Sequence, residues 1–201
     1  MCKITKVYNQ ADTTDKKARN WYTEACRFSL SLGVKYRLES YKAAGVIAAL
    51  SPMCSWTKNK VDADHFLDSM KQIGDPSLYK YTSYNANVLK AVRILEARNE
   101  KEVFKILRGS YGFKTASFFW NIYKPESDLY VTIDRHAYRI ATGEDVKSMT
   151  ERKYNQVVRM YREAASKLGE RPINLQAIVW TAHRRLEGID KRHDVYDEVP
   201  F

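Results

Sequence analysis

Apolar side chains recur every three or four residues along most of this chain, and no other feature constrains the fold as strongly. In the segment 15–32, for example, Trp21, Tyr22 and Phe28 fall on one face of a helix. A half-buried strand would instead alternate with a period of two, so the pattern predicts an all-α protein. A hydrophobic content of 44% over 201 residues is enough for a buried core.

The same spacing, with glycine, proline and capping residues between segments, predicts the helix boundaries. Thr13 or Thr14 is expected to cap the first helix, and Gly33 to follow its end. Residues 128–134 have strand-like composition, but a lone strand has no partner, so we expect an extended linker. Helices are expected at 15–32, 38–50, 55–73, 85–97, around 103–107, and at 115–123, 135–142, 150–168 and 173–187.

Charge and cysteine content limit the classes of function. Lys and Arg number 34 against 24 Asp and Glu, a net charge of +10 that suits a nucleic-acid-binding protein. No apolar run reaches the ~20 residues of a membrane span, and the first residues lack the apolar core of a signal peptide, so a cytoplasmic protein is expected. The three cysteines form no C-x-x-C pair, and neither a metal nor a cofactor is expected.

Two glycines join a short predicted helix to a strongly aromatic one. Glycines permit a sharp turn and a close backbone approach, and the free amides at the start of the next helix can point at a phosphate. The segment resembles a helix-hairpin-helix, an element that holds the DNA backbone without reading sequence. We therefore expect DNA contacts from Arg108, Gly109, Tyr111, Gly112 and Thr115, within Ile106-Leu107-Arg108-Gly109-Ser110-Tyr111-Gly112-Phe113-Lys114-Thr115-Ala116.

Twenty residues after Lys114 comes Ile133-Asp134-Arg135-His136-Ala137-Tyr138-Arg139-Ile140. Together the two segments resemble the helix-hairpin-helix DNA glycosylase superfamily, in which L-P-G-V-G-x-K-T-A precedes V-D-T-H-x-x-R-V. The resemblance implies a two-lobed all-α fold, with residues 36–128 as the hairpin lobe and residues 1–35 and 129–201 as the second lobe. It also places Lys114 on the nucleophilic lysine of endonuclease III-like members and Asp134 on the catalytic aspartate.

A third segment, Leu50-Ser51-Pro52-Met53-Cys54-Ser55, looks like the family's L-S-x-Q-x-T helix end. Met53 stands where repair enzymes carry a glutamine that enters the duplex, and a thioether can serve as an apolar wedge. Two departures from the family are visible. Two residues rather than one separate the hairpin glycines. The iron-sulfur cluster that follows the hairpin domain in endonuclease III is also absent.

The two candidate catalytic residues also have simpler readings. Lys114 is either a nucleophile with a lowered pKa, helped by Arg108 or Arg135, or a lysine that touches phosphate while Asp134 activates water. Asp134 is a favoured N-cap residue, and capping is compatible with stabilising a sugar cation. Arg135 is also expected to contact DNA.

A flipped base needs flat faces to stack on and polar groups to read its edge. Trp56 and Asn59 share one predicted helix face, and Trp180 and His183 share another. These four residues are the candidate base pocket, although each tryptophan also suits an ordinary core. The basic stretch 147–171 reads more simply as a solvated face.

The leading function from sequence is a DNA glycosylase, with or without lyase activity, that acts on a flipped nucleotide in double-stranded DNA. The first alternative is a glycosylase-fold transferase that installs an amine or amino acid on an activated thymine. The final helix, with Gln176-Ala177-Ile178-Val179-Trp180, resembles phage-associated proteins implicated in thymine hypermodification, which would place the chain in a bacterial or phage-infected cell. The second alternative is a DNA-binding module without chemistry, whose binding would be salt-sensitive.

Overall fold

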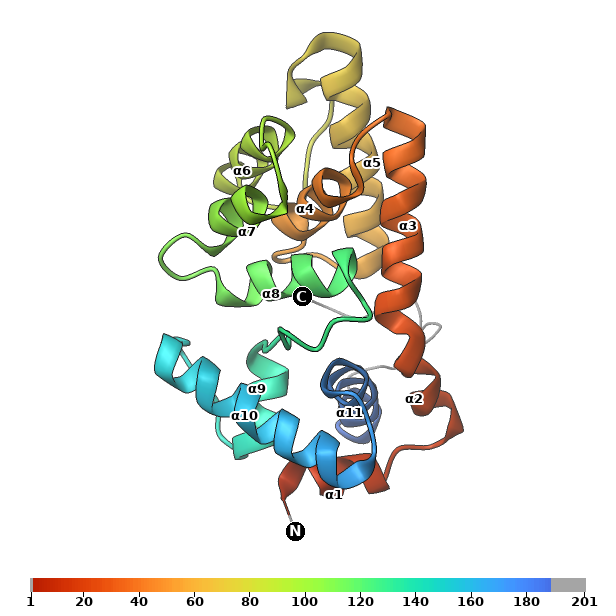
Figure 1. The fold of residues 1–201 in the computed structure, drawn as a ribbon, viewed down its shortest axis with the longest axis vertical. Coiled ribbons are helices and arrows are strands. Elements are labelled where there is room, and N and C mark those ends of the chain that lie inside the picture. The colour runs from red at the N-terminus through yellow and green to blue at the C-terminus, as the bar shows by residue number, and fades with distance from the viewer. Residues whose placement is uncertain (1, 189–201) are drawn as a thin grey trace.

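The computed structural model describes residues 2–188, and all regular secondary structure in this range is helical. The helices form two tiers, joined on one side by α3 and crossed by an extended segment between α8 and α9 (Figure 1). The all-α prediction is therefore confirmed. No helix in the described range is both long and apolar enough to cross a bilayer.

The upper tier surrounds α4, whose residues 43–50 are all buried. Gly45 allows this close packing, because a Cβ there would lie 2.6 Å from Val103 Cγ1. Helix α4 therefore acts as the centre against which α3, α6, α7 and α8 pack. The upper helices are α3 (Trp21–Tyr36), α4 (Ser40–Leu50), α5 (Trp56–Ile73), the 3₁₀ turn η2 (Pro76–Leu78), α6 (Asn85–Leu95), α7 (Glu100–Arg108) and α8 (Phe113–Tyr123).

The lower tier surrounds α11, which is buried along most of its length. The lower tier has its own hydrophobic core, separate from that of the upper tier. This core joins Ile4 at the N-terminus to Tyr161 and Val179 near the C-terminus. Both ends of the described chain therefore build this tier. The lower helices are α1 (Lys3–Asn9), α2 (Thr13–Lys17), the 3₁₀ turn η1 (Ala18–Asn20), α9 (Arg135–Thr142), α10 (Glu151–Leu168) and α11 (Pro172–Leu186).

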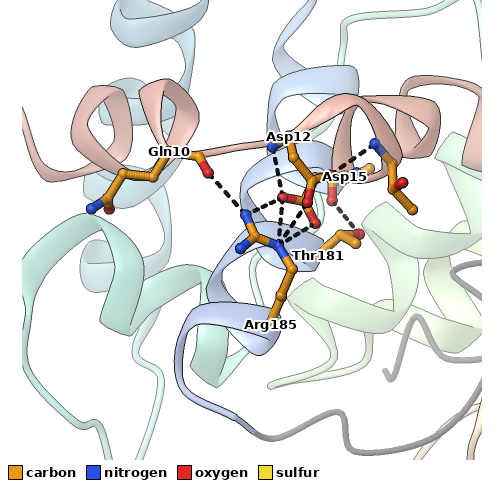
Figure 2. A network of polar contacts seen from close by, with 7 residues as sticks. Gln10, Asp12, Asp15, Thr181 and Arg185 are labelled. Atoms are coloured by element: carbon orange, nitrogen blue, oxygen red, sulfur yellow. Dashed lines mark hydrogen bonds and ion pairs between the residues drawn. The ribbon is translucent and has the colours of Figure 1, made fainter.

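A polar cluster ties the α1–α2 segment to the end of α11 (Figure 2). The Arg185 guanidinium lies 2.7 Å from the buried Asp15 carboxylate and 3.2 Å from Asp12, and it also donates to the Gln10 carbonyl at 2.9 Å. Asp12 caps α2 by accepting from the backbone amides of Thr14 and Asp15. The N-terminal segment is thus held by charge as well as by apolar packing.

The segment between α8 and α9 is extended, as its composition predicts, and side chains satisfy its backbone. Tyr154 donates its hydroxyl hydrogen to the Val131 carbonyl at 2.8 Å, and its oxygen accepts from the Ile133 amide at 3.2 Å. Asn121 donates to the Thr132 hydroxyl at 3.0 Å. The two Tyr154 bonds take the place of strand pairing at Val131 and Ile133.

Several predicted boundaries are wrong at the N-terminal end. The segment predicted as one helix over 15–32 is α2, η1 and α3, and its N-cap is Asp12 rather than Thr13 or Thr14. Gly33 lies inside α3, which ends at a left-handed Arg37. A Cβ on Gly33 would lie 3.1 Å from the Leu38 carbonyl oxygen, so the glycine serves close packing instead of ending the helix.

Two further differences concern α1 and α3. Helix α1 was not expected, because its short sequence has only one buried residue, Ile4. Sequence reasoning grouped residues 21–35 with the second lobe, whereas the buried side chains of α3 join the upper core beside α4 and α8.

Candidate active site

The turn between α7 and α8 depends on two glycines for different reasons. Gly109 adopts φ 40°, a conformation that side chains rarely allow. Gly112 has φ −85°, but a Cβ there would lie 2.0 Å from the Leu107 carbonyl oxygen. Its amide donates to the Arg108 carbonyl at 2.6 Å. Gly109 is therefore required by its backbone conformation, and Gly112 is required by the close approach of the Leu107 carbonyl.

Arg108 holds this turn in shape through its side chain. Its guanidinium donates to the Gly109 and Ser110 carbonyls at 2.9 and 3.2 Å and stacks 3.6 Å from the centre of the Phe113 ring. It also pairs with Glu151 of α10 at 3.2 Å. Arg108 therefore braces the hairpin internally, a role that sequence reasoning did not assign to it.

The hairpin presents two other predicted DNA-contacting residues at its surface. Tyr111 is 86% exposed at the tip of the turn. Thr115 is half-buried in the first turn of α8. The α8 amides in this turn have no partner from the helix itself, as at any helix start. The N-terminus of α8 therefore suits an anion.

Lys114 is the second residue of α8 and is half-buried. Burial lowers its pKa from the ordinary value of 10.5; the Asp134 and Cys54 side chains oppose this shift, and Arg135 adds to it. These influences place Lys114 near residues from two other segments, the loop before α5 and the start of α9. A lysine with a lowered pKa is more often neutral and so more able to act as a nucleophile.

Asp134 is the N-cap of α9 and is only 8% exposed. One carboxylate oxygen accepts from the Ala137 amide at 2.6 Å, and the other accepts from Trp180 Nε1 at 3.1 Å. The capping role is therefore real, and the carboxylate is close enough to Lys114 to influence its pKa. Bonds from backbone and indole donors hold such a group in a single orientation.

The loop before α5 brings Met53 and Cys54 to this region. Met53 is 71% exposed and adopts φ 69°, a strained conformation for a residue other than glycine. Cys54 donates its thiol to the Leu50 carbonyl at 3.3 Å, and burial raises its pKa to about 12. The thiol is therefore neutral, and the exposed methionine stands next to it along the chain.

Two of the four candidate base-pocket residues, Trp56 and His183, line different pockets. Trp56 lies edge-on to Trp21, with ring centres 5.0 Å apart, and Asn59 donates to the Ile47 carbonyl at 3.0 Å. Trp56 lines a pocket of about 410 Å³ between α3 and α5. His183 lines a different one, of about 590 Å³, and neither of these pockets is lined by Asp134.

Trp180 has a role that sequence reasoning missed. It is 1% exposed and supports Asp134 through its indole N–H. Gln176, four residues earlier on the same face of α11, accepts from the buried Tyr22 hydroxyl at 2.9 Å. The i, i+4 spacing in Gln176-Ala177-Ile178-Val179-Trp180 was the available signal for a shared buried polar face.

No group of three or more His, Cys, Asp or Glu side chains between residues 2 and 188 is arranged to hold a metal ion. The described chain is thus an all-helical protein of two tiers, with a half-buried lysine of lowered pKa and an oriented aspartate where a glycine hairpin meets an extended linker.

The chain belongs to DUF7178, a family of unknown function whose profile matches residues 1–187. Neither the curated proteins nor the solved structures yield a match.

Proposed function

We propose that this protein is a DNA glycosylase with lyase activity that acts on a flipped nucleotide. The observation that carries the proposal is that Lys114, whose pKa burial lowers, interacts electrostatically with the oriented Asp134 carboxylate. A nucleophilic amine beside a fixed anion is what displacement at a sugar carbon requires. The two-lobed glycosylase fold is part of the same proposal.

The surroundings suit a DNA duplex. The amides at the start of α8 receive a backbone phosphate, and the exposed Tyr111 and Met53 side chains face solvent on the two loops nearest Lys114. Apolar side chains inserted between base steps unstack them, which lowers the cost of flipping a nucleotide. In this arrangement Met53 is the wedge.

The chemistry is a displacement at C1′ of the flipped nucleotide. The neutral Lys114 Nζ forms a bond to C1′ while the bond from C1′ to the base breaks, and its electron pair leaves with the base. Asp134 stabilises the positive charge that develops on the sugar and passes a proton from the lysine nitrogen to the departing base. The sugar ring then opens to a Schiff base as its ring oxygen takes a proton from water.

The test uses the full chain with plain, damaged and phage-modified duplexes. Mass spectrometry of released bases and nucleosides should show free base, and borohydride should trap the protein on DNA. Lys114→Gln should abolish trapping, because its amide cannot form a Schiff base.

Other outcomes point elsewhere. A nucleoside of increased mass without free base would replace the glycosylase with a base-modifying transferase. Salt-sensitive DNA binding with no product from any duplex would leave a binding module and overturn the enzyme proposal.

A further inference from the structure

The lower tier holds a pocket that the proposed chemistry does not use. Its volume is about 590 Å³, and it opens where α1, α9 and α11 meet. The lining residues lie on these three helices or directly after their last residues. The lining residues are Lys3, Lys6, Val7, Gln10, Arg139, Ile140, Gly143, His183, Leu186 and Glu187.

The lining carries an excess of positive charge. Lys3, Lys6 and Arg139 provide three cations, and Glu187 is the one carboxylate among the lining residues. Arg139 lies 3.9 Å from Glu187 and 3.8 Å from the exposed Asp145, distances too long for strong pairing. The α9 C-terminus adds about half a negative charge. The balance therefore still favours an anion.

Lys3 is held in place at the edge of this pocket. Its ammonium group donates to the Thr142 carbonyl, the last residue of α9. A Cβ on Gly143 would lie 2.0 Å from Lys3 Nζ, so glycine at this position leaves room for the amine. The φ of 78° at Gly143 requires glycine for a second reason. A lysine anchored in this way loses less entropy on binding an anion than a free one.

His183 supplies an independent sign of a ligand. The side chain is 8% exposed, and its Nε2 atom is buried with no hydrogen-bond partner among the described residues. A buried polar nitrogen without a partner costs free energy. Burial lowers the pKa of His183, so the ring is neutral near pH 7, and one ring nitrogen can donate a hydrogen bond.

We propose that this pocket binds a phosphate group, with Lys6 and Arg139 pairing with its charge and the Nε2–H tautomer of His183 donating to one of its oxygens. Phosphate suits the site because it presents several acceptor oxygens to donors that converge from three helices. The site does not depend on the Lys114 chemistry. Neither Lys114 nor Asp134 lines this pocket.

The experiment titrates inorganic phosphate into the ¹⁵N-labelled full chain and follows the histidine side-chain resonances. The His183 Nε2 signal should shift and saturate. Lys6→Glu should weaken phosphate binding by roughly tenfold or more, the loss expected for one charge-assisted hydrogen bond. Lys17→Glu is the matched control, because it makes the same charge change at an exposed position on α2 outside the pocket. It should change the affinity by less than about twofold.

The proposal is overturned if phosphate leaves His183 unshifted, or if the two variants weaken binding equally. A second arm adds a short DNA duplex. If the duplex displaces phosphate and Lys6→Glu weakens duplex binding, the phosphate belongs to the DNA backbone. If phosphate and duplex bind independently, the ligand is a free phosphorylated small molecule. Base release is not measured in either arm, so the result stands apart from the proposed glycosylase activity.

Discussion

At the scale of single residues, Lys114 illustrates how placement alters chemistry. Desolvation disfavours its charged form, while Asp134 and Cys54 favour that form. Because burial has the largest effect, the amine binds a proton less tightly in the folded protein than in the unfolded chain. The lysine therefore carries a cost in stability that an apolar side chain would not.

Lys114→Met should raise the free energy of unfolding near neutral pH. The unfolded chain binds more protons between the folded and unfolded pKa values, so wild-type stability rises with pH over that window. The extra stability of the variant over wild type should therefore be largest below the pKa of Lys114 in the folded protein. It should shrink toward pH 10.5, the ordinary lysine pKa. Urea unfolding at a series of pH values measures it.

The matched control for this change is Lys101→Met, which alters an exposed lysine in the first turn of α7. It should change stability by no more than about 0.5 kcal/mol at any pH. If Lys114→Met instead lowers stability below pH 10.5 and this loss shrinks at higher pH, the attraction to Asp134 outweighs burial.

Asp134→Asn separates the capping role of this residue from its charge. The amide can still accept from Ala137, but it cannot also accept from Trp180 Nε1, so a loss of about 1–2 kcal/mol is expected. In the proposed chemistry, base release should fall by roughly 10²- to 10³-fold, because the variant lacks the charge that would stabilise the sugar cation. A quench assay that measures free base gives the rate.

Thr150→Ala provides the comparison, because Thr150 caps α10 and accepts from the Lys153 amide. It should cost about 1 kcal/mol and leave base release unchanged. If Asp134→Asn matches this control in both measurements, the aspartate is a cap and nothing more.

At the scale of elements, the hairpin depends on a close approach between backbones. Gly112→Ala would place its Cβ 2.0 Å from the Leu107 carbonyl oxygen, so the start of α8 must move. We expect a loss of about 1–3 kcal/mol, as for other overpacked sites. Affinity for every DNA sequence should fall together, because in the proposed function the displaced amides contact phosphate. Fluorescence anisotropy with two unrelated duplexes measures this.

Gly74→Ala tests whether any strained glycine change has the same effect. Gly74 ends α5 at φ 70° and has open space around its Cβ position. Its replacement should cost about 1 kcal/mol and leave DNA affinity unaltered. Unchanged affinity in Gly112→Ala would remove the hairpin from the binding surface.

At the scale of the whole molecule, the lower tier closes through contacts between distant segments. Arg185 near the end of α11 holds Asp12, Asp15 and Gln10, all within the first turns of the chain (Figure 2). The Asp15 side chain is only 3% exposed, while that of Arg185 is 42% exposed. Loss of the arginine would leave a buried carboxylate without its cation.

Arg185→Ala should therefore destabilise the protein by about 1–3 kcal/mol, less than a fully buried pair because solvent screens the arginine. Arg171→Ala breaks a comparable bond to Asp128 at 3.0 Å in which both side chains are exposed, and it should cost less than about 1 kcal/mol. Thermal unfolding of the two variants compares them. Equal losses of stability in the two variants would show that the burial of Asp15 does not strengthen its interaction with Arg185.

The sequence by itself determined the elements that depend on local pattern. Helical spacing and capping residues located α4, α5, α9, α10 and α11 closely, and the two glycines located the turn before Lys114. Local physics is sufficient here, because backbone conformation follows from neighbouring side chains and caps. It was insufficient for α1, whose single buried residue gives no periodic signal.

Only the tertiary structure decided which of these elements meet. Trp180 reaches Asp134 across 46 residues of sequence, and Cys54 comes close enough to Lys114 to influence its pKa. The pocket beside His183 likewise requires α1, α9 and α11 together. Spacing fixes the direction of a side chain on its own helix, but the partner it faces depends on how all the helices pack, which no local pattern contains.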